Sequence, residues 1–206
     1  MTKRTDIASM RPDAFFHIDE KVDNFAKIAD VSSELIYGIN QEKNSPWMTV
    51  VIPTYNRKEL FYQTLQSVLS QENVPYPWEI IVVDNTPLDE SGNTPALSVI
   101  KELAAKNVKL YHNRKNLGSG YNWNRGVELA RGEWVCFLHD DDVLCRDALQ
   151  QIGRLLNTKR NSKRKLGYLS ARKVEFQNKF GLRLSTEFPR QPQEVLNRFG
   201  VLVCGH

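Results

Sequence analysis

Short apolar runs alternate with helix-like stretches along the middle of the chain, from Met48 onward. The apolar, strand-like runs cover 48–53, 79–84, 108–112 and 133–138. The helix-like stretches that follow them lie around 60–69, 95–105, 120–130 and 146–156. Strands that are apolar on both faces and alternate with helices are typical of parallel sheets covered on both sides. The pattern predicts an α/β fold, with a mainly parallel open sheet and helices on both faces.

The segment before this pattern is less regular. Ile18, Val22, Phe25 and Ala29 are spaced like one face of a helix, although neighbouring apolar residues blur the period. Residues 44–46, Asn-Ser-Pro, are typical of a joint between segments. We therefore interpret residues 1–46 as an accessory N-terminal segment and residues 47–206 as the main domain.

The regular pattern also weakens toward the C-terminus. Residues 166–184 predict two strands that turn at 178–181, and residues 192–199 predict a short helix. The sequence then ends in VLVCGH, which is apolar where a polar tail is usual. We therefore expect a domain that is truncated at its C-terminus.

Composition and charge limit the expected location of the protein and its classes of partner. No apolar run approaches the ~20 residues of a membrane-spanning helix, and the N-terminus lacks the apolar core of a signal peptide. Three cysteines without CxxC spacing, Cys136, Cys145 and Cys204, indicate reduced thiols and a cytoplasmic location. A net charge of +4 is too mild to indicate nucleic acid.

A basic stretch, KRNSKRK, occupies residues 159–165. Its ordinary interpretation is a solvated loop. The alternative is contact with an anionic membrane surface or with a phospholipid-linked acceptor, at the inner face of the membrane.

Polar side chains follow each predicted strand. They are Pro53 to Arg57, Asp84 to Thr86, Asn113 to Asn116 and His139 to Asp142. Ligands of open α/β sheets bind outside the carboxyl ends of the strands. The sequence therefore predicts a binding site at this edge.

The Asp140–Asp142 triplet carries the strongest chemical signal. Three adjacent carboxylates after an apolar strand repel one another, and a divalent cation relieves this repulsion. Mg²⁺ or Mn²⁺ bound there would bridge a diphosphate and neutralise a leaving group. The alternative is an acidic first turn of the next helix.

Other residues of this edge are weaker signals, each with an ordinary structural alternative. Asp84 either accepts a hydrogen bond from a base or ribose or forms a turn. The Gly118–Gly120 segment either binds an anion or begins a helix. Tyr55 either stacks on a nucleobase or packs against the fold.

Taken in order, these segments resemble the family-two glycosyltransferases with the GT-A, Rossmann-like fold. The resemblance runs from about Thr49 to Leu156. Four segments carry it: VVIPTYNR followed by LFYQTLQSVLSQ, EIIVVDNT, NLGSGYNWNRGVELARGEW, and FLHDDDVL.

The resemblance implies roles for nine residues. The expected nucleotide-pocket residues are Pro53, Thr54, Tyr55 and Asp84. Asn116 and Asn124 match positions near the sugar diphosphate, and Asp141 would contact the ribose or the sugar. Asp142 would be the main ligand of a Mn²⁺ or Mg²⁺ ion, with Asp140 beside it.

The chain also departs from the family pattern. Trp123 stands where the family often has Arg, so Arg125 or Arg114 is a candidate for the missing cation. His139 stands at a position that is frequently acidic. The family's catalytic base is a carboxylate in the second half of the domain, and we expect it beyond residue 206.

The implied reaction moves a sugar, with inversion, from a nucleoside diphosphate donor to an acceptor. The donor would be UDP-linked, and the acceptor a saccharide or lipid-linked molecule of surface polysaccharide synthesis. One alternative is a catalytically silent fragment that binds nucleotide sugars. Another is a nucleotidyltransferase, but that class normally has a Gly- and basic-rich loop after the first strand, which VIPTYNRKEL lacks.

Overall fold

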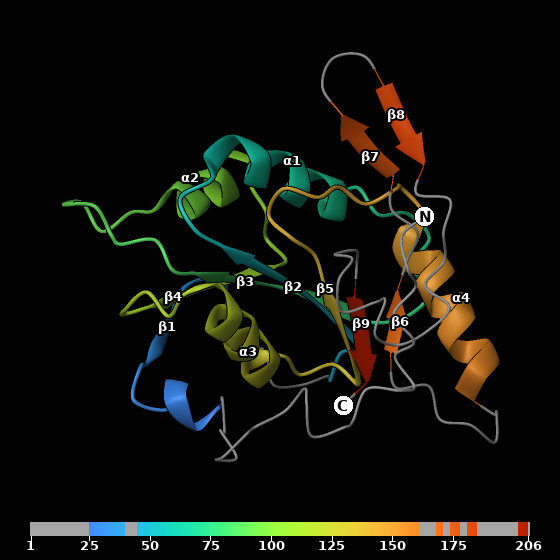
Figure 1. Ribbon diagram of the computed structural model, residues 1–206, viewed down its shortest axis with the longest axis horizontal. Helices are drawn as coiled ribbons and strands as arrows, with labels where there is room; N and C mark the ends of the chain where they lie inside the picture. The colour runs from blue at the N-terminus through green and yellow to red at the C-terminus, as the bar shows by residue number, and fades with distance from the viewer. Residues whose placement is uncertain are drawn as a thin grey trace, which may run out of the picture.

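The computed structural model describes residues 25–39 and 45–160, together with four short strands at 168–170, 174–177, 181–184 and 202–205. Four parallel strands form the centre of its main sheet (Figure 1). They are β2 (Met48–Thr54), β3 (Trp78–Asp84), β4 (Val108–Asn113) and β5 (Trp134–Phe137). All four predicted strands are confirmed, and so is their parallel arrangement.

Antiparallel strands extend both edges of this parallel core. The full order is β1-β4-β3-β2-β5-β9-β6, in which β1 (Ser33–Tyr37) precedes β4, and β9 (Leu202–Gly205) and β6 (Tyr168–Ser170) follow β5. Strands β7 (Val174–Gln177) and β8 (Gly181–Leu184), on either side of the predicted turn, pair antiparallel, while residues 178–180 lie outside the described residues. The helix predicted at 192–199 lies outside the described residues.

The N-terminal segment supplies one of these edge strands. Strand β1 (Ser33–Tyr37) pairs antiparallel with β4, with Ser33 opposite Asn113. Phe25 and Ala29 do not share a helix face as expected. They flank a 3-10 helix of three residues, Ala26–Ile28, and Phe25 is exposed. Residues 33–37 are therefore part of the main sheet, and residues 1–24 lie outside the description.

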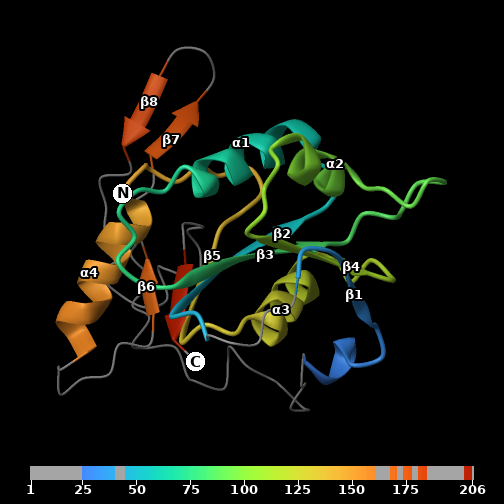
Figure 2. The same ribbon diagram turned by 180° about the vertical axis from the view of Figure 1, so that it is seen from behind.

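Helices cover both faces of the sheet, as the sequence predicts (Figures 1 and 2). The helices are α1 (Lys58–Leu69), α2 (Pro95–Glu102), α3 (Ser119–Leu129) and α4 (Ala148–Arg160). Buried residues of α1, α2 and α4 share one apolar core with alternate residues of the strands. Residues of α3 pack against the opposite face, where Val51 is buried. Successive strand residues point to opposite faces, so the wholly apolar strands serve both cores.

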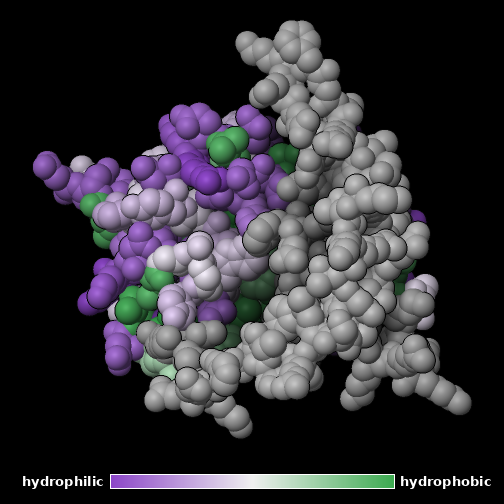
Figure 3. Space-filling view, viewed as in Figure 1, coloured by the Kyte–Doolittle hydropathy of each residue, from purple (hydrophilic) through white to green (hydrophobic). Residues whose placement is uncertain are grey.

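Helix α3 comes unusually close to the sheet. A Cβ atom on Gly126 would lie 2.4 Å from Cγ1 of Val51, which is too short for any real contact. A residue without a side chain is therefore needed at this point of α3, and Gly126 fixes the distance between α3 and β2. The surface over α1 and α2 is mainly hydrophilic, because these helices bury their apolar sides (Figure 3).

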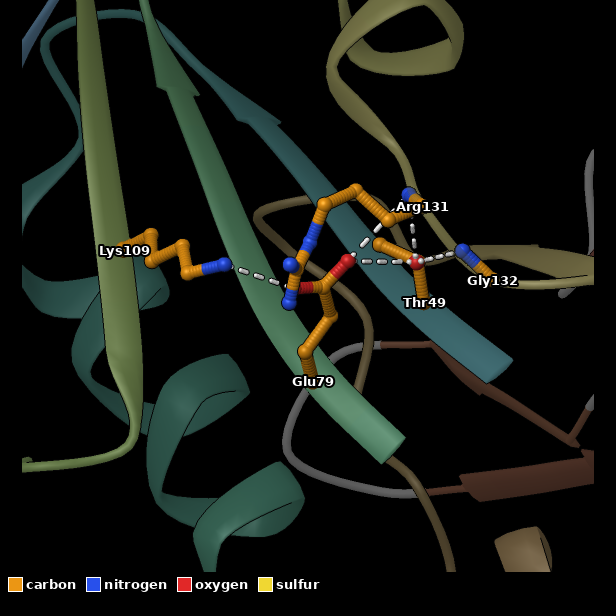
Figure 4. Close-up of polar contacts among 5 residues, drawn as sticks. All are labelled: Thr49, Glu79, Lys109, Arg131 and Gly132. Atoms are coloured by element: carbon orange, nitrogen blue, oxygen red, sulfur yellow. Dashed lines mark hydrogen bonds and ion pairs between the residues drawn. The ribbon is translucent and has the colours of Figure 1, made fainter. Parts of the chain in front are cut away.

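A polar cluster joins the amino ends of the strands (Figure 4). The Glu79 carboxylate accepts hydrogen bonds from Lys109 Nζ at 2.8 Å, Thr49 Oγ1 at 2.9 Å and Arg131 Nη2 at 3.2 Å. Thr49 Oγ1 also accepts a hydrogen bond from the Gly132 amide at 2.9 Å. The loop between α3 and β5 is thereby fixed to β2, β3 and β4.

Burial raises the pKa of Glu79, but the hydrogen bonds from Lys109 and Thr49, together with the charges of Lys109 and Arg131, outweigh it. The pKa of Glu79 therefore lies below its ordinary value of 4.5. In the part of the chain that the structure describes, no helix is long and apolar enough to cross a membrane. Cys136 is buried, Cys145 is exposed, and both are reduced.

Candidate functional site

A cleft of about 580 Å³ opens at the carboxyl ends of the parallel strands. Its walls come from the turns after β2, β3 and β5 and from the loop that begins α3. The lining residues are Pro53, Thr54, Tyr55, Arg57, Asn85, Asn116, Gly118, Ser119, Gly120, Asn122, Trp123, His139, Asp140 and Asp141. The predicted location of the site is thus where this cleft lies.

The turn after β2 is held against the end of β3. The Asn85 amide donates to the Thr54 carbonyl at 3.1 Å, and the Asn56 amide donates to Thr86 Oγ1 at 2.8 Å. Asn56 has a φ of 52°, a left-handed conformation that Asn adopts more readily than most residues. The chain then enters α1, with Arg57 at the N-cap position. This geometry places the half-exposed Tyr55 and Arg57 on the cleft.

Two carboxylates lie beside this turn. Thr54 Oγ1 donates a hydrogen bond to Asp140 Oδ2 at 2.9 Å, and both residues are buried. Arg57 Nη1 lies 2.5 Å from Asp141 Oδ2 and 3.4 Å from Asp140 Oδ1. The two aspartates therefore differ, because Asp140 is held inside the fold while Asp141 reaches into the cleft.

The surroundings of Asp140 raise the pKa of its carboxyl group. Burial raises the pKa of Asp140, and the charge of Asp141 adds to this effect. The hydrogen bond from Thr54 and the charge of Arg57 oppose the shift without cancelling it. Because the shift is upward, the charged form of Asp140 depends on the cations and donors around it.

Asp84, the last residue of β3, is fully buried. Its Oδ1 atom accepts a hydrogen bond from the Thr86 amide at 2.8 Å, which is the local turn contact named as the alternative role. Its Oδ2 atom has no hydrogen-bond partner within the described part of the chain. One carboxylate oxygen of Asp84 therefore stabilises the turn, and the other makes no hydrogen bond to a described residue.

A network of buried asparagines supports the loop that begins α3. Asn113 Nδ2 donates to Asn85 Oδ1 at 2.7 Å and to Asn122 Oδ1 at 2.8 Å. Asn85 in turn accepts from the Leu117 amide and donates to the Gly118 carbonyl. Ser33 of β1 donates to Asn113 Oδ1 at 2.5 Å. The N-terminal segment is thus joined, through Asn113, to residues that line the cleft.

The loop itself needs a glycine at its centre. Gly118 has a φ of 76°, in the region that favours glycine. Its amide donates a hydrogen bond to Asn116 Oδ1 at 2.8 Å. Gly118, Ser119 and Gly120 line the cleft, and no side chain caps the start of α3. The backbone N–H groups of this first helical turn are therefore suited to an anion.

The structure brings together six of the nine predicted site residues on the cleft. They are Pro53, Thr54, Tyr55, Asn116, Asp140 and Asp141. Asp84, Asn124 and Asp142 are not among the described residues that line it. The Asp142 amide donates to the His139 carbonyl at 3.2 Å, so the backbone of this residue closes a turn that contains the other two aspartates. Within the described ranges, no group of three or more His, Cys, Asp or Glu residues is arranged to hold a metal.

Neither candidate for the missing cation reaches the cleft. Arg125 Nη2 donates to the carbonyls of Ile28 and Val31, and its Nη1 pairs with Glu128. Arg114 pairs with Glu34 of β1. Both arginines thus bind other parts of the fold, including the N-terminal segment that the sequence analysis treated separately.

The sequence analysis placed Arg57 and Asn85 at the predicted binding edge without giving either a role, and it did not single out Asn122. Arg57 lies within the quoted VVIPTYNR segment, so its place in that motif was the available signal. Trp123 forms an aromatic wall: its ring stacks on Phe137 at 5.2 Å and meets the His139 ring edge-on at 4.7 Å. The unusual Trp at this position therefore replaces a possible charge with a flat apolar surface.

These features agree with a comparison against known protein families. The model of glycosyl transferase family 2 matches residues 49–195, which is more than half of the chain. The chain belongs to this family.

Relatives of this chain include two proteins that are named as sugar transferases. It is 32% identical over 106 residues to the poly(ribitol-phosphate) beta-N-acetylglucosaminyltransferase TarP of Staphylococcus aureus, covering 51% of this chain and 31% of that one. It is 32% identical over 115 residues to the GalNAc(5)-diNAcBac-PP-undecaprenol beta-1,3-glucosyltransferase of Campylobacter jejuni, covering 54% and 35%. The chain thus spans about a third of the length of these two relatives.

Similar solved structures include S. aureus TarS in complex with UDP-GlcNAc, with 25% identity and a TM-score of 0.46 over 54% of this chain and 31% of that one. Another is the mannosyltransferase PcManGT of Pyrobaculum calidifontis in complex with GDP-Man and Mn²⁺, with 22% identity and a TM-score of 0.47 over 68% and 37%.

Proposed function

We propose that this chain binds the nucleotide sugar of a glycosyltransferase that builds a surface polysaccharide. The observation that carries the proposal is the cleft at the carboxyl ends of β2, β3 and β5, in which Thr54, Asp140, Arg57 and Asp141 form one connected network. Family membership supports a sugar-transfer reaction rather than nucleotidyl transfer. The donor would be a nucleoside diphosphate sugar, with UDP as its nucleotide.

Residues of the cleft divide naturally between the parts of such a donor. Tyr55, half-exposed at the end of β2, offers a ring on which a nucleobase stacks. Asp84, whose Oδ2 has no partner among the described residues, would accept an N–H of the base after a small opening of its turn. The loop 118–120 presents the start of α3 to the diphosphate. Trp123 would line the sugar.

A divalent cation, Mn²⁺ or Mg²⁺, fits the cleft with a different ligand from the one first expected. Such ions need only one or two carboxylates when phosphate oxygens complete the shell. Asp141 is exposed in the cleft, whereas Asp142 does not line it. We therefore assign the ion to Asp141, with Asp140 beside it. When bound, the ion would neutralise charge on the departing diphosphate.

The acceptor half of the reaction is assigned by similarity alone. The printed names of the relatives point to saccharide and lipid-linked acceptors, and such a chain would work at the inner face of the membrane. The basic stretch 159–165, proposed to contact that surface, lies mostly outside the described residues. Asp140 and Asp141 are the carboxylates that line the described cleft. Asp140 accepts a hydrogen bond from Thr54, and Asp141 forms an ion pair with Arg57. The general base is therefore a residue still to be assigned, and a chain that binds donors without transfer is the second candidate.

Calorimetry with UDP tests the proposal. We expect UDP to bind, and to bind more tightly when Mn²⁺ is added. Asp141→Asn should abolish the effect of Mn²⁺, whereas its neighbour Asp142→Asn should keep it. Absence of UDP binding in the unaltered chain, with or without Mn²⁺, would reject the function. A transfer assay with a UDP-sugar and a saccharide acceptor then separates an enzyme from a binding chain.

A further inference from the structure

Arg57 is the arginine of the described cleft lining, which contains no lysine. In the structure its guanidinium is turned toward the carboxylates of Asp140 and Asp141. Those same carboxylates are where a divalent cation would bind, so arginine and metal would compete for one place. The competition follows from charge alone, since a guanidinium keeps its proton at every relevant pH.

The two contacts of Arg57 differ in strength. The contact with Asp140 is long, at 3.4 Å, and Asp140 already accepts a hydrogen bond from Thr54. The contact with Asp141 is short, at 2.5 Å, but the two side chains are 47% and 44% exposed. Ion pairs between such exposed groups contribute little to stability because water solvates both partners. Arg57 can therefore leave Asp141 at small cost.

The backbone of Arg57 does not have to move for this exchange. Its carbonyl accepts the Phe61 amide at 3.2 Å in the first turn of α1, and the preceding Asn56 amide is fixed to Thr86. The flexible part is the side chain, which is half-exposed at the mouth of the cleft. Rotation of the side chain is enough to carry the guanidinium from the carboxylates to another anion in the same cleft.

We propose that Arg57 is an exchangeable counterion. In the free protein it pairs with Asp140 and Asp141, and on donor binding a divalent cation takes its place while Arg57 transfers to the diphosphate. The inference rests on the proposed function. It makes Arg57 a diphosphate-binding residue, and it explains how part of the charge of the carboxylate pair is offset before the metal arrives.

Opposite effects on metal and on nucleotide follow from this exchange. Without nucleotide, Arg57 opposes the metal, because two like charges lie near the same carboxylates. With nucleotide, the guanidinium instead forms charge-assisted hydrogen bonds to the phosphate oxygens. Replacing Arg57 should therefore strengthen the binding of the metal in the absence of nucleotide and weaken the binding of the nucleotide.

The experiment uses the full 206-residue chain and the variants Arg57→Gln and Lys58→Gln. Lys58 is the matched control, because it is the adjacent basic residue, is similarly exposed, pairs with Glu102 and does not line the cleft. Mn²⁺ binding is measured without nucleotide by electron paramagnetic resonance of the free ion. UDP binding is measured by calorimetry at saturating Mn²⁺, and thermal melting checks that each variant is folded.

We expect Arg57→Gln to bind Mn²⁺ about three- to tenfold more tightly in the absence of nucleotide. The same variant should bind UDP about tenfold more weakly at saturating Mn²⁺. Lys58→Gln should match the unaltered chain in both measurements. If UDP binds the unaltered chain but Arg57→Gln leaves both affinities unchanged, or weakens both, the exchange is wrong while the proposed function stands. If the unaltered chain binds no UDP, both are wrong.

Discussion

Thr54 and Asp140 lie 86 positions apart in the chain, yet Thr54 Oγ1 donates a buried hydrogen bond of 2.9 Å to Asp140 Oδ2. The bond joins the end of β2 to the turn after β5. Burial raises the pKa of Asp140, and the Thr54 hydrogen bond opposes that shift. The pair therefore connects the two sides of the cleft, and its hydrogen bond favours the charged form of a buried carboxylate.

The first prediction concerns this bond. Thr54→Val preserves the shape of the side chain but removes the donor, so we expect a loss of about 1–2 kcal/mol in the free energy of unfolding at pH 7. The pKa of Asp140 should rise further. Urea denaturation measures the first effect, and a carboxyl titration by NMR measures the second. Thr54→Ser, which keeps the hydroxyl, is the control; a loss in Thr54→Ser as large as that in Thr54→Val would show that the hydrogen bond to Asp140 is not the cause.

The second prediction separates the two roles of Asp84. In Asp84→Asn the amide oxygen can still accept the Thr86 amide, so melting should change little. The amide group cannot accept an N–H where the second carboxylate oxygen stood. We therefore expect UDP binding to weaken by about 1–3 kcal/mol.

Asp89→Asn is the control for this second prediction, because Asp89 makes similar turn contacts to Ser91 and Asn93 in an exposed loop. It should leave UDP affinity unchanged. A large fall in melting temperature of Asp84→Asn, at constant UDP affinity, would instead assign Asp84 to the turn alone.

The third prediction follows from the low pKa of Glu79. A carboxyl whose pKa is lower in the folded than in the unfolded chain stabilises the fold above its unfolded pKa, and this contribution is lost as the pH falls through the folded pKa. Glu79→Gln leaves Lys109 and Arg131 without their shared carboxylate. We expect it to cost about 3 kcal/mol at pH 7.

The difference between Glu79→Gln and the unaltered chain should shrink as the pH falls below about 4.5, where the Glu79 carboxylate begins to protonate. Chemical denaturation at a series of pH values measures it. Glu72→Gln is a control, because Glu72 forms an exposed pair with Arg146, and we expect a change within about 0.5 kcal/mol. A difference that stays constant down to pH 3 would contradict the charge of Glu79 as the cause.

The fourth prediction compares two glycines of α3. Gly126→Ala places a methyl group against Val51 and forces the helix away from β2, so we expect a loss of about 1–3 kcal/mol. Gly120→Ala meets no atom within 4 Å, and alanine favours a helix, so it should be neutral or slightly stabilising. Thermal melting of both variants checks the pair. A similar loss in both would show that helix propensity, rather than the contact with Val51, decides the outcome.

Hydrophobic periodicity by itself determined the central architecture. The four parallel strands and the four helices follow from local pattern, because a strand such as Val50–Ile52 has to bury both faces and α1 only one. The sequence also predicted two strands on either side of residues 178–181, and β7 and β8 pair there. Six of the nine predicted residues line the cleft because they lie at or after the end of a strand, and all parallel strands end at one edge of the sheet.

Tertiary structure alone decided which member of a local cluster faces the cleft and which partner each charge takes. Asp141 and Asp142 are adjacent and identical in type, and only the path of the turn after β5 separates them. Arg57, Arg114 and Arg125 were equally able to bind an anion, but pairing with Glu34 and with the Ile28 and Val31 carbonyls removed two of them. The same holds for β1, whose contacts with β4 and Asn113 join residues about 80 positions apart. Long-range contacts of this kind depend on the folded arrangement of the whole sheet, which local periodicity does not encode.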